Sequence, residues 1–275
     1  TVSLSRAIFV VPGLVCAFGL CVSGDRLSPV GSVAASAEQA DGPSWLRLPD
    51  VTPRYRDSAL LDAPGERIVV LGGEASLGAA SAAAIQLDLA SGMWQVYEPS
   101  GTVPTRRSAA GAVRGSGAVL DPAERVAVFV CDCARASTFL LDLAADRWQV
   151  APNDRDLGVS GGITVYDPVG DRVLLFGGQR HGIGDYLAGA WAYDMSPART
   201  GWRALPDVPF AVRGASATLD PGGGDVLVFG GLSAEGEVSA TLWRFDLARV
   251  DQADAWTDLT DLAGPWPPAR AGAAM

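Results

Sequence analysis

The sequence predicts an all-β protein built from copies of one four-stranded unit, and three observations support that prediction. Four short apolar runs, rich in Val, Leu and Ile, recur along the chain, and three of them end in two glycines. Each run follows a turn whose Asp lies ten residues before the first of these glycines, or before Cys131 in the second copy. Five tryptophans recur at intervals of 49, 54, 54 and 54 residues. The apolar runs are Arg67–Gly73, Arg125–Asp132, Arg172–Gly178 and Asp225–Gly231.

Each interval between tryptophans supplies four candidate strands. The first consists of small residues, as in RGASATLD, the second is the apolar run, the third ends in Asp, and the fourth begins with Trp. Short runs bounded by Gly, Pro and Asp are typical of antiparallel sheet. Four strands in a period near 50 residues are typical of a β-propeller blade. The sequence therefore predicts a β-propeller with four full blades, at about 53–97, 104–151, 158–205 and 210–259.

Partial strands are expected at both ends of this propeller. Trp45–Pro49 has the pattern of a lone fourth strand, and Ala269–Met275 has the pattern of a lone first strand. We therefore interpret residues 45–275 as an incomplete propeller and the chain as a fragment of a longer reading frame.

The repeat resembles the kelch repeat over residues 45–275. The shared features are a P-x-x-R segment before the small-residue strand, an Asp-Pro turn, an apolar strand ending in Gly-Gly, an aromatic residue or Leu followed by Asp, and a Trp. The resemblance, which extends to the central domain of galactose oxidase-like proteins, implies radially packed four-stranded blades with the diglycine at the end of the second strand. A repeat solenoid is the alternative architecture.

Composition and charge narrow the classes of function. The 275 residues include 33 Gly and 18 Pro and only 19% charged residues, which favours many short strands over disorder. All 21 basic residues are Arg, and the net charge is −10. That charge argues against nucleic acid or an anionic membrane surface as a partner of the whole molecule.

An apolar run, Ala7–Val22, follows Arg6 near the start of the chain. It is shorter than the roughly 20 residues of a membrane span. Ala35-Ser36-Ala37 has the form of a signal-peptidase site, with cleavage before Glu38. We interpret residues 1–37 as an export signal and 38–44 as a linker, which predicts a secreted protein or one of the periplasm or cell envelope, with no membrane insertion after cleavage.

Other interpretations of this segment stay open. Cys16 and Cys21 lie near the end of the apolar run, so a lipoprotein is possible, but Val15 and Leu20 stand where a small residue precedes a lipidated Cys. An uncleaved anchor and a buried element of a larger domain are the remaining alternatives.

The second copy replaces its diglycine with Cys131-Asp132-Cys133. This spacing differs from the C-x-x-C of zinc and thioredoxin-type sites. A metal site, a disulfide between Cys131 and Cys133 or with another partner, and unreactive packed thiols are the three interpretations, and we predict no metal and no cofactor.

Arginines at the start of the first strands are the strongest candidates for ligand binding. Arg56, Arg107 and Arg270 each lie three residues after a Pro, and Arg213 lies four after Pro209. Equivalent positions in successive blades would form a ring at one mouth of a central channel, broken in the third blade by Ser160. Converging guanidinium groups bind carboxylates or phosphates through paired hydrogen bonds. The alternative is that each Arg pairs with an Asp of a neighbouring blade.

The loop after the third diglycine is a second candidate ligand site. It carries Arg180, His181 and Tyr186, which are chemically varied side chains on a rigid scaffold. A solvated connection is the alternative. The tryptophans are interpreted as blade core, and each turn Asp is interpreted as a cap of its turn.

No catalytic residue can be assigned. Among proteins that resemble kelch propellers, copper-radical oxidases use two His ligands, whereas this chain has only His181. No motif of the exported sialic acid epimerases can be aligned with it either. We therefore predict an exported module that binds a protein or glycan ligand, acidic ligands included, at an Arg-lined channel mouth. An exported carbohydrate-active enzyme and a structural domain of a larger surface protein are the alternatives.

Overall fold

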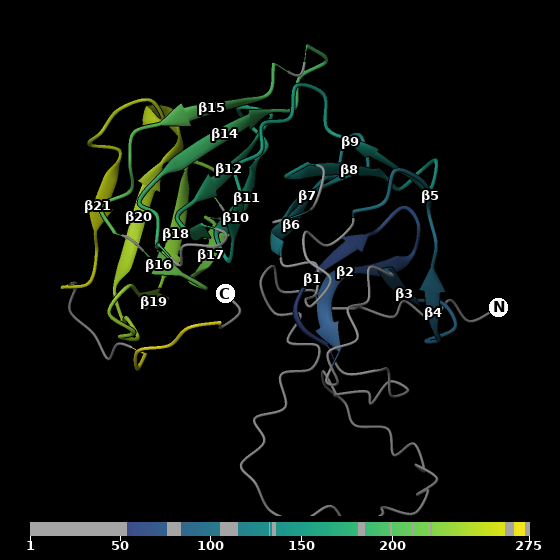
Figure 1. The fold of residues 1–275 in the computed structure, drawn as a ribbon, viewed down its shortest axis with the longest axis horizontal. Coiled ribbons are helices and arrows are strands. Elements are labelled where there is room, and N and C mark those ends of the chain that lie inside the picture. Colours follow the sequence, from purple (N-terminus) through teal and green to yellow (C-terminus); the bar gives the residue numbers. More distant parts are fainter. Residues whose placement is uncertain are drawn as a thin grey trace, which may run out of the picture.

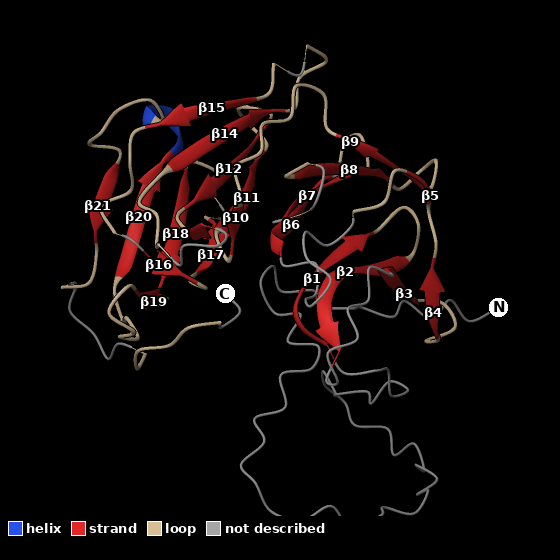
Figure 2. Cartoon of the chain, viewed as in Figure 1, coloured by secondary structure: helices blue, strands red, loops and turns tan. Residues whose placement is uncertain are grey.

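The computed structural model describes residues 54–75, 84–104, 115–131, 133, 136–180, 185–198, 200–210, 212–220, 222–261 and 267–272. The predicted export signal, linker and first partial strand lie outside these residues. Over the described ranges the protein is all-β, and four antiparallel sheets of the repeat are arranged as the blades of a propeller (Figure 1, Figure 2). The predicted fold class is confirmed. Within the same ranges, no helix has the length and apolar character to cross a membrane.

Each blade is a meander of four strands. Blade 1 contains β1 (Arg54–Asp62), β2 (Arg67–Ala75), β3 (Ala84–Asp88) and β4 (Trp94–Tyr97). Blade 2 contains β6 (Gly115–Asp121), β7 (Val126–Cys131), β8 (Thr138–Asp142) and β9 (Arg147–Val150). Blade 3 contains β11 (Ile163–Asp167), β12 (Arg172–Phe176), β14 (Ala190–Asp194) and β15 (Trp202–Leu205). Blade 4 contains β17 (Ser216–Leu219), β18 (Asp225–Phe229), β20 (Leu242–Asp246) and β21 (Trp256–Asp258).

Shorter elements lie outside the four meanders. β5 (Ser100–Gly101) pairs in parallel with β9 and so attaches the connection from blade 1 to the outer strand of blade 2. A 3-10 helix, η1 (Leu247–Arg249), follows β20. Two pairs of two-residue strands complete the set, and each continues the hairpin formed by the first two strands of its blade. The pairs are β10 (Val159–Ser160) with β13 (Gln179–Arg180) and β16 (Val212–Arg213) with β19 (Leu232–Ser233).

The first strands of successive blades lie next to one another, in the order β1, β6, β11, β17 (Figure 1). Because side chains alternate along a strand, each blade presents one apolar face to the blade before it and another to the blade after it. Three buried clusters fill the three junctions between consecutive blades. Packing between sheets therefore holds the described propeller together.

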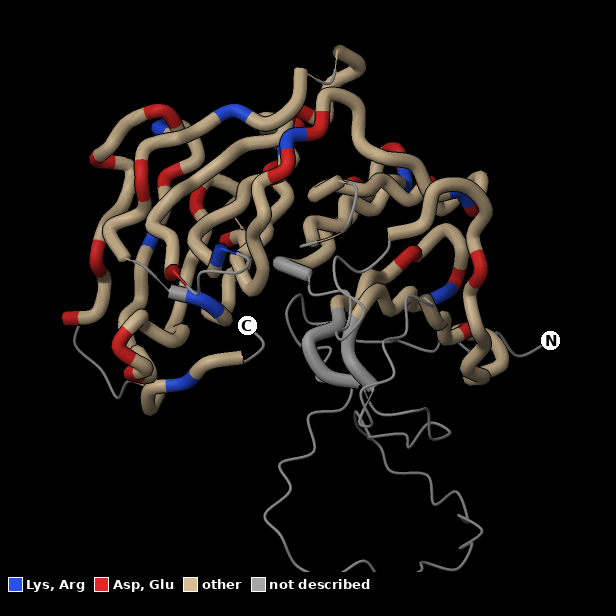
Figure 3. The backbone as a smooth tube through the Cα atoms, viewed as in Figure 1, with Lys and Arg blue, Asp and Glu red and all other residues tan. Residues whose placement is uncertain are grey.

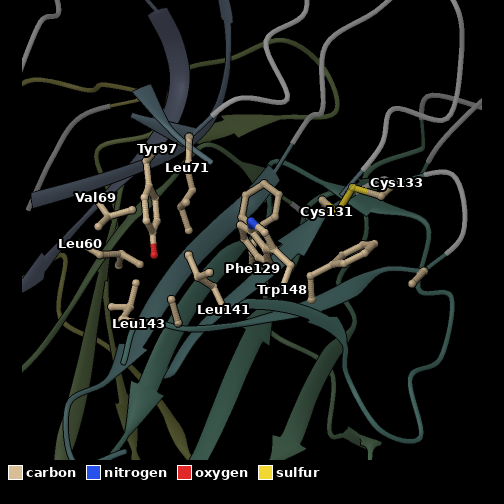
Figure 4. Close-up of a cluster of buried hydrophobic side chains, with 14 residues drawn as sticks. Leu60, Val69, Leu71, Tyr97, Phe129, Cys131, Cys133, Leu141, Leu143 and Trp148 are labelled. Atoms are coloured by element: carbon tan, nitrogen blue, oxygen red, sulfur yellow. A yellow bond between two sulfur atoms is a disulfide. The ribbon is translucent and has the colours of Figure 1, made fainter. Parts of the chain in front are cut away.

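The repeated tryptophans belong to these junctions. Trp148 packs edge-on against Phe129 and Phe139 in the cluster between blades 1 and 2 (Figure 4). Trp202 contributes to the cluster between blades 2 and 3 and donates its Nε1 hydrogen to Thr138 Oγ1 at 2.7 Å. Trp256 packs against the cluster between blades 3 and 4. The prediction as core residues is confirmed for these three tryptophans. Trp94 is half-buried and belongs to none of the three clusters, and Trp45 lies outside the described residues.

The turn before each second strand is capped by its Asp, as predicted. In blade 3, Asp167 Oδ1 accepts hydrogen bonds from the amides of Val169 and Gly170, both at 3.0 Å. In blade 4, Asp220 Oδ2 accepts from Gly222 at 2.9 Å. These bonds satisfy backbone donors that the tight turn leaves without a ladder partner.

In the second copy of the turn, the Arg stands four residues after its Asp, whereas in blades 1 and 3 it stands five residues after it. Arg125 precedes β7 and has a left-handed backbone, with φ of 56°, like Glu66 and Asp171 in the turns of blades 1 and 3. Val126 therefore takes the position of Arg67 and Arg172 in the pairing with the turn Asp. This one-residue shift points the Arg125 side chain to blade 1.

The irregular C-x-C segment is closed by a disulfide. Cys131 and Cys133 are joined, both are fully buried, and both belong to the cluster between blades 1 and 2 (Figure 4). Of the three interpretations that the sequence left open, the local disulfide is the one found. The sulfur atoms fill space beside the aromatic side chains of blade 2.

Candidate ligand-binding site

The short strand pairs at the ends of the blade 3 and blade 4 hairpins bring together two of the sequence-predicted residues, Arg213 and Tyr186. In blade 3, Ser160 lies opposite Gln179, and Gln179 also forms an isolated bridge with Tyr186. In blade 4, Arg213 lies opposite Leu232. Ser160 thus takes the place of Arg213 in the third blade, as the sequence predicted.

A backbone contact sets the two hairpins side by side. The amide of Gly214 donates to the carbonyl of Gly161 at 2.9 Å. Gly161 has φ of 66°, and a Cβ added there would lie 3.5 Å from the Cβ of Arg213. The left-handed backbone at Gly161 favours glycine there, and a Cβ at this position would be in ordinary contact with the stem of Arg213.

Arg213 reaches across the junction to blade 3. Its Nη1 donates to Oε1 of Gln179 at 2.9 Å, and its guanidinium lies 5.6 Å from the ring centroid of Tyr186. The amide and the ring fix the orientation of the guanidinium, and a cation over an aromatic ring is itself favourable. The Arg213 side chain is half-buried, so its contacts are made at the edge of solvent.

The partners of Arg213 are neutral, which distinguishes it from the arginines of the blade turns. Within the described ranges, Arg213 forms no ion pair with Asp or Glu, and its Nε and Nη2 donate no hydrogen bond. Arg67 and Arg172, by contrast, each pair with the Asp of their own turn. Nε and Nη2 form the edge of a guanidinium that a carboxylate engages with both oxygens.

The other predicted site residues form no described contact with Arg213. Arg180 follows Gln179 in β13 and is exposed. Arg270 is exposed and donates its Nε to the carbonyl of Pro268 at 3.1 Å. Arg56 lies in β1, but its side chain is not among the described ones. Arg107 and His181 lie outside the described residues.

The segment 267–272, part of the expected lone strand, forms no strand but attaches to blade 4. The amide of Gly272 donates to the carbonyl of Gly214 at 2.7 Å, repeating the bond from Gly214 to Gly161. The amide of Gly231 donates to the carbonyl of Arg270 at 2.9 Å. Arg270 is therefore placed beyond blade 4 much as Arg213 is placed beyond blade 3.

A buried ionic network that sequence reasoning missed joins blades 1 and 2. The Asp62 carboxylate accepts hydrogen bonds from Arg67 Nε at 2.9 Å and from Arg125 Nη2 at 2.7 Å. Arg67 also donates to the carbonyl of Leu143 at 2.7 Å and to Asp146 at 2.9 Å. The proposed role of an Arg as a link between blades thus belongs to Arg67 and Arg125. The sequence signal for the pairing within a turn was an Arg five residues after the turn Asp, as in Asp62 and Arg67.

Burial and charge act in opposite directions on this network. Burial raises the pKa of Asp62, but the hydrogen bonds from Arg125 and Arg67 and their positive charges lower it more, so that it lies below its ordinary value. The pKa of Asp146 is lowered in the same way, against burial, by the Tyr97 hydroxyl at 2.5 Å and by Arg67. Both carboxylates are therefore held ionised at neutral pH, and they serve structure at a blade junction.

Blade 3 uses the same device towards blade 4. Arg172 donates its Nε to Asp167 at 2.7 Å and its Nη2 to the carbonyl of Leu247 at 3.1 Å. Figure 3 shows the charged positions mainly at turns and strand ends, with long uncharged stretches along the strands. Among the residues that the structure describes, no three His, Cys, Asp or Glu side chains gather as a set of metal ligands.

The chain was compared with protein families and with curated proteins. No family model matches it, and no curated sequence is significantly similar to it.

Proposed function

We propose that this chain is a kelch-like propeller module that binds an acidic group of a protein or glycan at Arg213. The observation that carries the proposal is the half-buried guanidinium whose described partners, Gln179 and Tyr186, are both neutral. A cation removed from part of its water gains most from an anionic partner. A ligand carboxylate on the Nε and Nη2 edge would supply that partner.

Neighbouring residues support the same ligand chemistry. Arg180 is exposed in β13, the strand that carries Gln179, and Arg270 is exposed in the segment that attaches to blade 4. The hydroxyl of Ser160 and the amide of Gln179 belong to the hairpin that Arg213 contacts. The proposed site is therefore an Arg-centred patch between blades 3 and 4 that recognises a carboxylate.

The test is titration of the purified protein with a fluorescein-labelled peptide of alternating Glu and Gly, followed by fluorescence anisotropy. We expect saturable binding that a matching Gln peptide does not compete. Arg213→Gln should weaken binding at least tenfold, and Arg213→Lys should also weaken it because Lys has no two-donor edge. Arg203→Gln, on the outer strand β15 and paired with Asp251, is the control and should bind as wild type does. Equal binding by wild type and Arg213→Gln would refute the proposal.

We also propose that the module works outside the cytoplasm. The pattern of residues 1–37 supports export, and the disulfide between Cys131 and Cys133 is of a kind that persists in oxidising compartments. Mass spectrometry of the protein recovered from the cell envelope or medium should find Glu38 as its first residue. An intact 1–37 segment on a cytoplasmic product would contradict this.

A further inference from the structure

We propose that the ligand of Arg213 is a peptide in which an apolar side chain lies near the acidic one, and that Leu232 and Val238 bind the apolar side chain. The inference rests on the proposed carboxylate site and names the class of ligand. It starts from the residues that share a face with Arg213 on blade 4.

The three side chains form one row. Arg213 in β16 lies directly opposite Leu232 in β19, and Leu232 forms an isolated bridge with Val238. Residues opposite one another on antiparallel strands project to the same face, with Cβ atoms about 5 Å apart. A charged group and two apolar side chains therefore stand side by side at the end of blade 4.

The apolar end of this row is open to solvent. Val238 is 46% exposed, one of few large apolar side chains that are, and Leu232 is half-buried. A ligand that covers a branched apolar side chain gains free energy by removing its surface from water. One ligand that carries a carboxylate and an apolar side chain would account both for the exposed Val238 and for the lack of a described acidic partner at Arg213.

Blade 3 shows that the apolar pair is particular to blade 4. At the corresponding positions, Gln179 and Tyr186 replace Leu232 and Val238, and these polar groups hold the Arg213 guanidinium. Nη1 of the guanidinium thus has a polar partner in blade 3, while the neighbours of Arg213 within blade 4 are Leu232 and then Val238. A peptide offers a carboxylate and an aliphatic side chain a few ångströms apart along an extended backbone, whereas an acidic sugar offers hydroxyl groups there.

The experiment compares peptides that differ only beside the Glu. The probes are N-acetylated, amidated pentapeptides with Leu two residues before or two residues after a single Glu, matched peptides with Asn in place of Leu, and glucuronate as an acidic sugar. We expect one Leu peptide to bind about fivefold more tightly than its Asn match, close to the effect of one methylene group removed from water.

Variants assign the preference to its residues. Leu232→Asn and Val238→Thr should each reduce the advantage of the Leu peptide and leave the Asn peptide unaffected. Val169→Thr, in a turn of blade 3 where Val169 is 81% exposed, is the control and should retain the advantage. Near-ultraviolet circular dichroism verifies that each variant is folded.

The outcomes distinguish failure of the apolar subsite from failure of the carboxylate site at Arg213. Equal binding of the Leu and Asn peptides, both dependent on Arg213, would refute the apolar subsite and leave the carboxylate site standing. Binding of glucuronate with no binding of any peptide would overturn the peptide ligand in favour of a glycan. Failure of every probe to bind wild type would refute both proposals.

Discussion

Replacement of Asp62 by Ala tests whether the ionic network between blades 1 and 2 stabilises the fold. Asp62 is completely buried, and its carboxylate accepts hydrogen bonds from Arg67 Nε at 2.9 Å and from Arg125 Nε and Nη2 at 3.0 and 2.7 Å. It also accepts from the amide of Gly65 at 3.3 Å, as a turn cap. The substitution leaves two guanidinium groups facing each other with no anion between them.

The structure sets the size of the loss. Removal of one partner of a buried ion pair lowers the free energy of unfolding by roughly 3–5 kcal/mol. Because the Arg67 and Arg125 side chains keep 13% and 26% of their exposure, they can recover some water, so we expect about 3 kcal/mol. The loss is measured as the change in the free energy of unfolding in urea, followed by tryptophan fluorescence.

Asp220→Ala is the matched control. Asp220 occupies the same turn position in blade 4 and caps Gly222, but no ion pair joins it to a described Arg, and Asp225 stands where blades 1 and 3 have an Arg. The control therefore removes the cap alone and should cost about 1 kcal/mol. If Asp62→Ala destabilises the protein no more than Asp220→Ala does, the network does not stabilise the junction.

The same comparison has a defined pH dependence. The folded-state pKa of Asp62 lies below its unfolded value of about 4. The stabilisation is therefore complete above pH 4 and is lost as the pH falls towards the folded-state pKa. The stability difference between wild type and Asp62→Ala should be constant from pH 6 to 8 and smaller at the lowest pH at which both remain folded. A difference that does not narrow would contradict the assigned ionisation.

Three further predictions concern the turns, a junction and the disulfide. Gly178→Ala should lower the free energy of unfolding in urea by about 3 kcal/mol, since φ is +101° and the new Cβ would lie 2.5 Å from Val159 Cγ1. Gly223→Ala, where φ is +74° and nothing lies within 4 Å of the new Cβ, should lower it by about 1 kcal/mol. Equal losses would show that the contact with Val159 is unimportant. Trp202→Phe removes the bond to the buried Thr138 hydroxyl and should cost about 2 kcal/mol by the same assay, so an unchanged midpoint would refute the role of that bond. Trypsin digestion of the unreduced protein after alkylation should release the peptide 126–135 unalkylated and about 2 Da below its dithiol mass; recovery of the doubly alkylated peptide would show that Cys131 and Cys133 are free thiols.

Local sequence signals were sufficient for the blades. The turn Asp, the left-handed glycines and the alternation of apolar residues act within ten residues of one another, and each occurs in several copies. A strand and its hairpin depend mainly on such short-range features, so the four-stranded meander of each blade could be predicted from the repeat alone. The core position of the tryptophans followed from the same register.

The partners of individual arginines could not be predicted in this way. The offset of Arg125 by one residue can be counted from the turn Asp, but the sequence does not show which group its side chain then meets. The offset sends Arg125 to Asp62, which lies 63 residues earlier in the chain. Only the packing of blade 2 against blade 1 brings these two groups together.

In the candidate site, too, some features were determined by the sequence and others by the tertiary structure. The sequence alone determined the repeat, its four blades and the recurrence of Arg at the start of first strands. The tertiary structure decided that Arg213 meets Gln179, 34 residues away, and the ring of Tyr186, while Arg67 and Arg125 both bind the buried carboxylate of Asp62. The physical reason is that backbone turns are set by neighbours in the chain, whereas a long charged side chain is placed by whichever blade packs beside it.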